Sequence, residues 1–517
     1  MAETGFRKWI IVVTVILASL LEIIDSTVVN VSLTQIMGNL GGTLEDAAWL
    51  ITAYGVANVI ILPMTGWLSA KFGRKNYFAF SIILFTVASF LCGNSHNIWE
   101  LAIFRFVQGI GGGALLSTSQ SILFETFAPE DRGMATAIFG LGVIIGPTVG
   151  PTLGGYITDH FSWPWIFYIN LPLGAIAAVL TFIYIKESTH NQRKVDVVDW
   201  LGIALLIVGI GSLQIVLERG ESEDWFETTY IIVLAVVSLI SIVAFIWREL
   251  VIDHPIVDLR ILSSSRSLAV GMFFTFILGF GLYSSVFVLP IFCQNLLGFT
   301  AQQTGWLLFP AGLATAFMMP IIGTIIRKGF PPQVLAGIGF GAFFLFTSWL
   351  SKSTLASGEN DFFWPLMLRA VGMACLFVPL TNLAFSGVGK KDMPQATGLN
   401  NMMRQLGGSF GIAIMTTFIA QRTAYHRMNL ITHITDSSVE TMNRLNASVA
   451  NFLSKGYSLQ DAQAIGYKSL EGAVIKQSLL MSYMDSFFIV GLFFLICIPL
   501  LTLSRRAKNA PVVMDAH

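Results

Sequence analysis

The fold of this chain is decided by stretches such as Trp9-IIVVTVILASLLEIIDSTVVN-Val31, which is apolar along nearly its whole length. A helix needs about 20 residues of this kind to cross the ~30 Å hydrocarbon layer of a bilayer. Similar runs recur along almost the entire sequence. Because lipid offers no hydrogen-bonding partner to backbone amides, each of these runs must be helical. The sequence therefore predicts an all-α polytopic membrane protein.

Composition supports this fold class and argues against others. Of the 517 residues, 54% are hydrophobic and only 12% are charged, against about 25% charged in soluble proteins. The formal net charge is zero, so electrostatics do not favour nucleic acid as a partner. The four cysteines are far apart in the sequence (Cys92, Cys293, Cys375 and Cys497). They therefore indicate neither a disulfide framework nor a metal site.

The apolar runs predict fourteen spans, and the distribution of positive charge predicts their orientation. The spans are expected near residues 9–31, 47–68, 77–94, 98–121, 134–157, 164–185, 199–217, 228–247, 268–292, 304–326, 332–350, 363–386, 396–420 and 480–503. Short cytoplasmic loops are enriched in Lys and Arg. With the N-terminus inside, the short outer loops carry only Arg219 and Lys352, whereas the inner segments carry most of the rest, including Arg193, Lys194 and Arg505. Both termini are therefore expected in the cytoplasm.

Two features repeat at equivalent places, which predicts two six-span halves. The loop Gly66-WLSAKFGR-Lys75 after the second span has a weaker counterpart in Gly323-TIIR-Lys328 after the tenth, and Arg105 in the fourth span has one in Arg369 of the twelfth. Parallel six-span repeats are typical of a large class of transporters. The expected domains are 1–185 with six helices, 186–267 with two additional helices, and 268–517 with six helices and a long outer loop, 421–479.

The first span carries polar residues on one side. Glu22, Asp25, Ser26 and Asn30 fall within about 140° of one helix face. An ionised carboxylate inside a membrane is costly, so it must face a cavity, find a partner or stay protonated, and each option lets it exchange a proton. Ser26 and Asn30 could equally just bond neighbouring helices. Glu22 and Asp25 are therefore candidates for proton coupling.

Arginines inside the spans are further candidates. Arg105 is followed by Gly109 and Gly113 at four-residue steps, and glycines let a second helix approach closely enough to supply a partner. Arg105 could handle protons together with the carboxylates, or it could form a fixed structural pair. Contacts within the bundle or at a gate are expected of Arg369, Arg404, Gln108 and Asn30.

Glycines recur every four residues in the fifth span, and two of them are followed directly by proline. The residues concerned are Gly142, Gly146, Pro147, Gly150, Pro151 and Gly154, with Gly155 beside the last. Glycines let a facing helix pack backbone to backbone, while each proline removes a hydrogen bond and bends the helix. A plain dimerisation face would not need the prolines.

Together these stretches resemble the fourteen-span drug:proton antiporters of the major facilitator superfamily, and most closely the EmrB type. The resemblance is carried by Leu21-EIIDSTVVN-Val31, the 66–75 loop, Arg105-FVQGIGG-Gly113, Gly150-PTLG-Gly155, Trp163-PWIFYINL-Pro172 and Arg404-QLGGSF-Gly411. It implies the major facilitator fold, with two six-helix bundles plus two additional central helices. It also implies a proton-coupled antiporter that exports hydrophobic or amphipathic compounds through the inner membrane of a bacterial cell, with protons as the coupling ion and no cofactor.

The resemblance also assigns roles to residues. Asp25 matches the acidic position of the family's first-span motif, with Glu22 a second proton site or a contact for cationic substrates, and Arg105 is tied to proton handling. The fifth-span glycines and prolines match the antiporter motif of exporters. The cytoplasmic loop motif is matched by Gly66, Gly73, Arg74 and Lys75. This chain has Ala70 where that motif usually has an acidic residue, so a charge relay through that acid is not expected.

The segment 421–479 is expected to form helices outside the membrane. Ser437-SV-Glu440 and Ser458-LQ-Asp461 both fit a helix-starting capping box, and an apolar stripe runs from Val439 to Phe452. Such a helix must cover the transporter's own outer face, the lipid interface or a partner. EmrB-type pumps work with a periplasmic adaptor and an outer-membrane channel, so the resemblance implies these partners.

Two other functions compete with export. A proton-coupled importer of a small nutrient is disfavoured by the fifth-span pattern. A membrane-embedded lipid-modifying enzyme would need a catalytic set or metal ligands in the spans, and the seven histidines form no H-E-x-x-H sequence. The chain also has no G-x-x-x-x-G-K-[ST] phosphate loop, so an electrochemical gradient is expected to drive transport.

Overall fold

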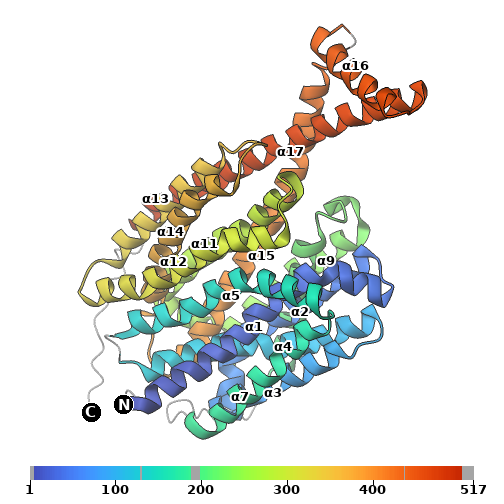
Figure 1. Ribbon diagram of the computed structural model, residues 1–517. Coiled ribbons are helices and arrows are strands. Elements are labelled where there is room, and N and C mark those ends of the chain that lie inside the picture. Colours follow the sequence, from blue (N-terminus) through green and yellow to red (C-terminus); the bar gives the residue numbers. More distant parts are fainter. Residues whose placement is uncertain (1–4, 129–130, 188–197, 436, 503–517) are drawn as a thin grey trace.

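The computed structural model describes residues 5–128, 131–187, 198–435 and 437–502, and every regular element within them is a helix (Figure 1). The first part of the chain forms α1 (Gly5–Leu40), α2 (Leu44–Phe72), α3 (Arg74–Gly93), α4 (Ile98–Thr126), α5 (Arg132–His160), α6 (Trp165–Tyr168) and α7 (Asn170–Tyr184). The middle forms α8 (Trp200–Arg219), the turn η2 (Trp225–Glu227), α9 (Thr229–Val251) and α10 (Arg260–Ser264). The rest forms α11 (Arg266–Ile291), η3 (Phe292–Leu296), α12 (Ala301–Arg327), α13 (Pro332–Leu350), α14 (Glu359–Phe385), α15 (Met393–Ile431), α16 (Val439–Ser454) and α17 (Leu459–Leu500).

The predicted all-α membrane fold is confirmed, whereas the count of fourteen spans stays a prediction. Twelve helices within the described residues are long and apolar enough to cross a membrane. Each of the fourteen predicted ranges coincides with a helix, or with the pair α6 and α7. Two of the predicted spans, those in α5 and α15, are not among the twelve. In α5 only Arg132–Val143 counts as an apolar helix, and it is shorter than a span. The predicted span in α15 contains the polar residues Asn400, Asn401 and Arg404.

The helices of the first half and of the second half have the same neighbours. Helix α1 packs on α4 and α5, as α11 packs on α14 and α15; α4 packs on α2 and α3, as α14 packs on α12 and α13; and α3 packs on α7, as α13 packs on α17. The domains proposed from the sequence, 1–185, 186–267 and 268–517, remain a proposal that this repeated set of neighbours supports.

The two halves touch each other on the side of the body where α1 begins and α17 ends, here called the termini side (Figure 1). A Cβ placed on Gly66 of α2 would stand 2.7 Å from Cα of Gln395 of α15, and one on Gly323 of α12 would stand 2.9 Å from the carbonyl oxygen of Gly133 of α5. Asn401 of α15 donates a hydrogen bond to Oε1 of Gln120 of α4 (2.9 Å). The termini side is therefore closed by direct contact between the halves.

Helices α8 and α9 form a pair held together at the termini side by a bidentate ion pair. Arg248 donates to both carboxylate oxygens of Asp199, at 2.7 and 2.8 Å. Hydrogen bonds from Arg248 lower the pKa of Asp199. The same carboxylate accepts the backbone N–H of Gly202 and so caps α8. Helix α8 packs on α9 and also contacts α2 of the first half and α15 of the second.

A helical arm projects from the side opposite the termini (Figure 1). It consists of the end of α15, all of α16 and the start of α17, so the thirteenth and fourteenth predicted spans continue beyond the body without a break. The prediction of a helix start at Ser458 is confirmed, because its hydroxyl accepts the N–H of Asp461. The other start is shifted by one residue: Ser438, not Ser437, caps α16 by accepting the N–H of Thr441. Leu445 and Val449 of the predicted stripe pack on α17 near Gly466, whereas Val439 is 73% exposed.

Candidate functional site

An ion pair is buried inside the first half. Nη1 of Arg105 on α4 contacts Oδ2 of Asp25 on α1, and each side chain is only 1% exposed. The pair unites the two residues that sequence analysis named first for proton coupling. Breaking a buried pair by removing one partner leaves an uncompensated charge, at a cost of about 3–5 kcal/mol. A member of this pair therefore needs other partners if its counterpart is to lose its charge.

Amide side chains from two further positions complete the surroundings of Asp25. Gln108 of α4 and Asn170 of α7 each donate a hydrogen bond to Oδ1 of Asp25, both at 2.8 Å. Gln108 also donates to the hydroxyl of Ser89 on α3 (2.7 Å), so four helices of one half meet at this carboxylate. Gln108 was predicted to make bundle or gate contacts, and it makes them inside the bundle.

Arg105 has partners other than Asp25. Its guanidinium donates to Oε1 of Gln108 (2.7 Å) and to the carbonyl oxygen of Leu50 (3.4 Å), and it lies over the ring of Tyr54, 4.1 Å from the centroid. A cation on an aromatic face is stabilised where water is excluded. Arg105 therefore has three partners that do not depend on the charge of Asp25.

Glu22 lies one helical turn before Asp25 but has different surroundings. Its Oε1 accepts a hydrogen bond from Asn58 of α2 (3.1 Å). Its Oε2 is shielded from solvent and accepts no hydrogen bond from the residues that the structure describes. The cation that acts on it is Arg404 of α15, in the other half. The two first-span carboxylates thus have different surroundings: Asp25 forms an ion pair with an arginine of its own half, whereas Glu22 bonds to Asn58 and feels the charge of Arg404 in the opposite half without forming an ion pair with it.

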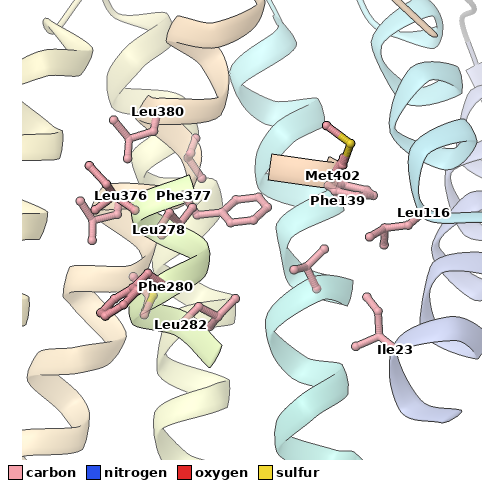
Figure 2. Close-up of a cluster of buried hydrophobic side chains, with 14 of the residues drawn as sticks. Ile23, Leu116, Phe139, Leu278, Phe280, Leu282, Leu376, Phe377, Leu380 and Met402 are labelled. Atoms are coloured by element: carbon pink, nitrogen blue, oxygen red, sulfur yellow. The ribbon is translucent and has the colours of Figure 1, made fainter. Parts of the chain in front are cut away.

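Apolar side chains of both halves face each other beside Glu22 and Arg404. Figure 2 shows Phe139 of the first half close to Phe377 and Met402 of the second, with Ile23 and Leu116 behind α5 in the same apolar cluster. The rings of Phe139 and Phe377 are 6.5 Å apart. Arg404 itself lies 5.8 Å from the Phe377 ring centroid, and its Nε makes no hydrogen bond within the described part of the chain. A hydrophobic compound with a cationic or polar group would find suitable partners here.

The fifth-span glycines lie along α1, on the side away from its carboxylates. A Cβ on Gly146 or Gly150 would overlap the side chains of Ile23 and Thr27, respectively, and one on Gly154 would stand 3.0 Å from the carbonyl oxygen of Val28. Gly142 is less crowded, with Ser19 Cβ at 4.0 Å. Pro147 and Pro151 lie inside the same helix, and Gly155 follows on it. The glycine face therefore sets how closely α5 supports the helix that carries Glu22 and Asp25.

The loop motif on the termini side is tied down by two acidic residues from elsewhere in the chain. Arg74 forms an ion pair with Glu125 at the end of α4, and the backbone N–H groups of Arg74 and Lys75 donate to Glu187 at 2.7 and 3.3 Å. Gly73 has φ +85, a conformation that residues with a side chain rarely adopt. The basic end of the loop thus has two acidic partners, Glu125 and Glu187, that the sequence analysis did not identify.

The remaining predicted residues are spread over the molecule. Arg369 of α14 is buried in the second half, where it donates to Ser285 of α11 at 3.4 Å. Asn30 is exposed on α1, five residues beyond Asp25, and its bundle or gate contact stays a prediction. Sequence reasoning left Ser89, Tyr54, Asn58 and Asn170 unassigned. Asn170 belongs to the stretch Trp163–Pro172. A polar residue inside the predicted span 164–185 was the signal that could have identified it.

Two helical halves with a buried acid–base pair in one of them, and charged and apolar groups facing each other between them, define a secondary transporter. Residues 15–412 match the Major Facilitator Superfamily, and the chain belongs to this family. It is therefore a transporter rather than an enzyme. Within the described residues, no group of three His, Cys, Asp or Glu side chains could hold a metal ion.

Comparison with known proteins shows which members of the Major Facilitator Superfamily this chain is similar to. The chain is 34% identical over 512 residues to the multidrug export protein EmrB of Escherichia coli (strain K12), covering 98% of this chain and 97% of that protein. It is 32% identical over 490 residues to the fatty acid resistance protein FarB of Neisseria gonorrhoeae, covering 95% and 94%. The solved structure of the proton:xylose symporter XylE shares the fold, with a TM-score of 0.60, 13% identity, and coverage of 95% of this chain and 96% of that one. The resemblance to EmrB-type proteins is confirmed.

Proposed function

We propose that this protein is a proton-coupled antiporter that exports hydrophobic or amphipathic toxic compounds. The observation that carries the proposal is the different surroundings of two carboxylates on α1: Asp25 is enclosed with Arg105 in one half, while Glu22 bonds to Asn58 and is influenced by the charge of Arg404 from the other half. One carboxylate can exchange a proton while the other contacts a substrate. Because both lie on one rigid helix, a movement that serves one site also moves the other.

Alternating access supplies the coupling step. In this structure the halves meet on the termini side through α2, α4 and α15, and α5 and α12 touch on the opposite side as well, where Gly305 lies against Thr152. We infer that a central site opens toward the side that bears the arm, away from the contacts of α2 and α4 with α15. Protonation of Asp25 would weaken its bond to Arg105 and loosen α1 from α4, while α5 moves with α1 through the glycine face. Rocking of the halves would then expose the central site to the termini side for the next substrate.

The direction of transport is inferred from two sources. The similar proteins are named as an export protein and a resistance protein, and the glycine–proline pattern of α5 resembles the antiporter motif. The termini side is accordingly proposed to be cytoplasmic, the membrane to be the inner membrane of a bacterial cell, and the arm to lie outside it. The competing importer lacks a supporting observation in the structure.

Accumulation of dyes and drugs in cells tests this function. Cells with the gene should hold less of a lipophilic cation such as ethidium than cells without it, and collapse of the pH gradient should remove the difference. Equal accumulation in both, or a difference that survives collapse of the gradient, would contradict proton-driven export.

Glu22→Gln is expected to change substrate preference more than proton coupling. The substitution removes a charge that faces Arg404 while keeping the hydrogen bond with Asn58. Efflux of monovalent cations should fall roughly tenfold, which corresponds to about 1.4 kcal/mol of lost attraction, while efflux of neutral compounds should stay near wild type. Parallel rates for a cationic and a neutral dye in proteoliposomes give the measurement. An equal loss for both dyes would assign Glu22 to proton handling instead.

The arm is proposed to contact a periplasmic adaptor that leads to an outer-membrane channel. Its end projects beyond the body, and Val439 remains exposed where Leu445 and Val449 are covered by α17. Such exposed apolar positions on an amphipathic helix suit a protein partner.

Replacement of residues 430–470 by a short Gly/Ser linker should separate transport from resistance. The arm lies outside the paired helices of the body, so proteoliposomes should keep proton-linked transport within about twofold, while cellular resistance should fall strongly. Equal loss of both activities would mean that the arm belongs to the transport machinery itself.

A further inference from the structure

A second polar cluster lies away from the Asp25 site. It is formed at the junction where α8, one of the two helices between the halves, contacts both halves. Nε2 of Gln214 on α8 donates one hydrogen bond to Oγ of Ser409 on α15 (2.8 Å) and one to Oε1 of Glu218 on its own helix (2.6 Å). On the other side, α8 packs on α2 of the first half. One side-chain network in α8 therefore touches the second half directly and reaches the first half through Glu218.

The carboxylate of Glu218 lies directly on α2. A Cβ placed on Gly55 would stand 2.6 Å from Oε1 of Glu218, so α2 can approach only because residue 55 is glycine. Oε2 is shielded from solvent and has no hydrogen bond of good geometry from the described residues. Thr52 of α2 is the other polar side chain that interacts with this carboxyl group.

Arg219 is the cation that acts on the carboxylate of Glu218, and it also has other partners. Arg219 forms an ion pair with Glu223 (2.8 Å), donates to the carbonyl oxygen of Glu45 (3.3 Å) and lies over the Trp49 ring. The sequence of α2 carries no acidic or basic residue between Asp46 and Lys71, and that of α15 carries none between Arg404 and Arg422. On α9, Arg248 and Glu249 lie at the opposite end of the helix pair, beside Asp199, and Tyr230 lies near Arg219 and Glu223.

These contacts link ionisation of Glu218 to the position of α8. Gln214 and Thr52 are neutral partners of this carboxyl group, and the charge of Arg219 is shared with Glu223, so together they offset the cost of burying an ionised Glu218 only in part. The closed junction therefore favours the neutral acid. Glu218 as a whole is half-buried, but its Oε2 is shielded against α2. Hydration of that oxygen in an ionised Glu218 therefore requires α8 to move away from α2 near Gly55. The junction is therefore closed with a proton and open without one.

We propose that Glu218 is a second proton-binding group of this transporter, located in additional helix α8, and that it releases its proton when the junction with α2 and α15 opens. The proposal rests on the proposed proton-coupled transport, because α2 and α15 belong to opposite halves whose relative movement opens and closes the junction. It also gives α8 a role in the transport cycle. The proton at Glu218 exchanges in step with the rocking of the halves, separately from the one at Asp25.

Infrared difference spectroscopy of the full chain in lipid nanodiscs tests the proposal. Spectra taken between about pH 5 and pH 9 report the loss of the C=O stretch of protonated carboxyl groups as each group ionises. Glu218→Gln should remove one component of this signal. The matched control Glu221→Gln, which alters an exposed carboxylate three residues along the chain, should leave that component in place, and so should Asp25→Asn.

An unchanged difference spectrum in Glu218→Gln would overturn the proposal. If that variant folds poorly, Gln214→Leu serves instead, because loss of the hydrogen bond to Oε1 should shift the frequency of the same component; an unshifted spectrum again contradicts it. Proton movement driven by tetraphenylphosphonium in wild-type proteoliposomes is recorded alongside. Its absence would refute the proposed function, whereas its presence together with an unchanged spectrum would refute only the role of Glu218.

Discussion

Asp25→Asn should insert and bind substrate, yet lose efflux driven by a proton gradient by at least about 100-fold, equivalent to about 2.7 kcal/mol. The amide has nearly the same shape as the carboxyl group and can keep polar contacts with Gln108 and Asn170, but it cannot exchange a proton. Arg105 retains Gln108, the carbonyl oxygen of Leu50 and the Tyr54 ring as partners. The fold should therefore survive the loss of the ion pair.

Efflux from proteoliposomes with an imposed pH gradient measures the effect, with binding of a fluorescent substrate assayed on the same preparation. Asp224→Asn, which changes an exposed carboxylate in the turn after α8, is the matched control and should behave as wild type. Efflux at the wild-type rate from Asp25→Asn would show that another group carries the proton, with Glu22 and Glu218 the next candidates.

Gly150→Leu is expected to reduce transport at least tenfold, by about 1.4 kcal/mol or more, while membrane insertion changes little. A Cβ at this position would already overlap Thr27 of α1, and a leucine would hold α5 and α1 apart along the face that supports Glu22 and Asp25. Gly146→Leu should act in the same way through Ile23. The effect is structural at a distance, because neither glycine contacts a carboxylate.

Alanine variants of the same helix provide the control. Gly142→Ala should be tolerated because Ser19 Cβ lies 4.0 Å from the new methyl group, whereas Gly150→Ala should be impaired. Efflux rates normalised to the amount of folded protein in the membrane compare the two. Normal export by well-expressed Gly150→Leu protein would remove the close-packing account of the glycine face.

Much of the fold could be predicted from the sequence because the bilayer imposes a length and a polarity on every span. The repeats could be inferred from equivalent loops and from arginines at equivalent places in two spans. The need of Arg105 for a carboxylate partner followed from the cost of burying charge in a membrane. What the sequence could not supply was direction around each helix: Glu22 and Asp25 lie on one face by spacing, yet one faces Asn58 and the other Arg105.

Other features depend on contacts between distant parts of the chain. Ala70 indicated a missing acid in the loop motif, but the contacts of Arg74 with Glu125 and Glu187 form only when α4 and the segment after α7 meet the loop. Asn30 belonged to the polar face by spacing and is exposed, because the network ends around Asp25. Glu218 could not be recognised as a candidate proton site. It stands next to Arg219, directly after the predicted span 199–217, where charged residues are common.

Proton movement during substrate transport tests the central claim most directly. Proteoliposomes with an acidic lumen and a trapped pH-sensitive dye should show alkalinisation of the lumen when ethidium is added outside, because protons leave as the cation enters. The response should be present in wild type and Asp224→Asn and absent in Asp25→Asn. Ethidium uptake without a change in luminal pH, or with acidification of the lumen, would contradict antiport through Asp25.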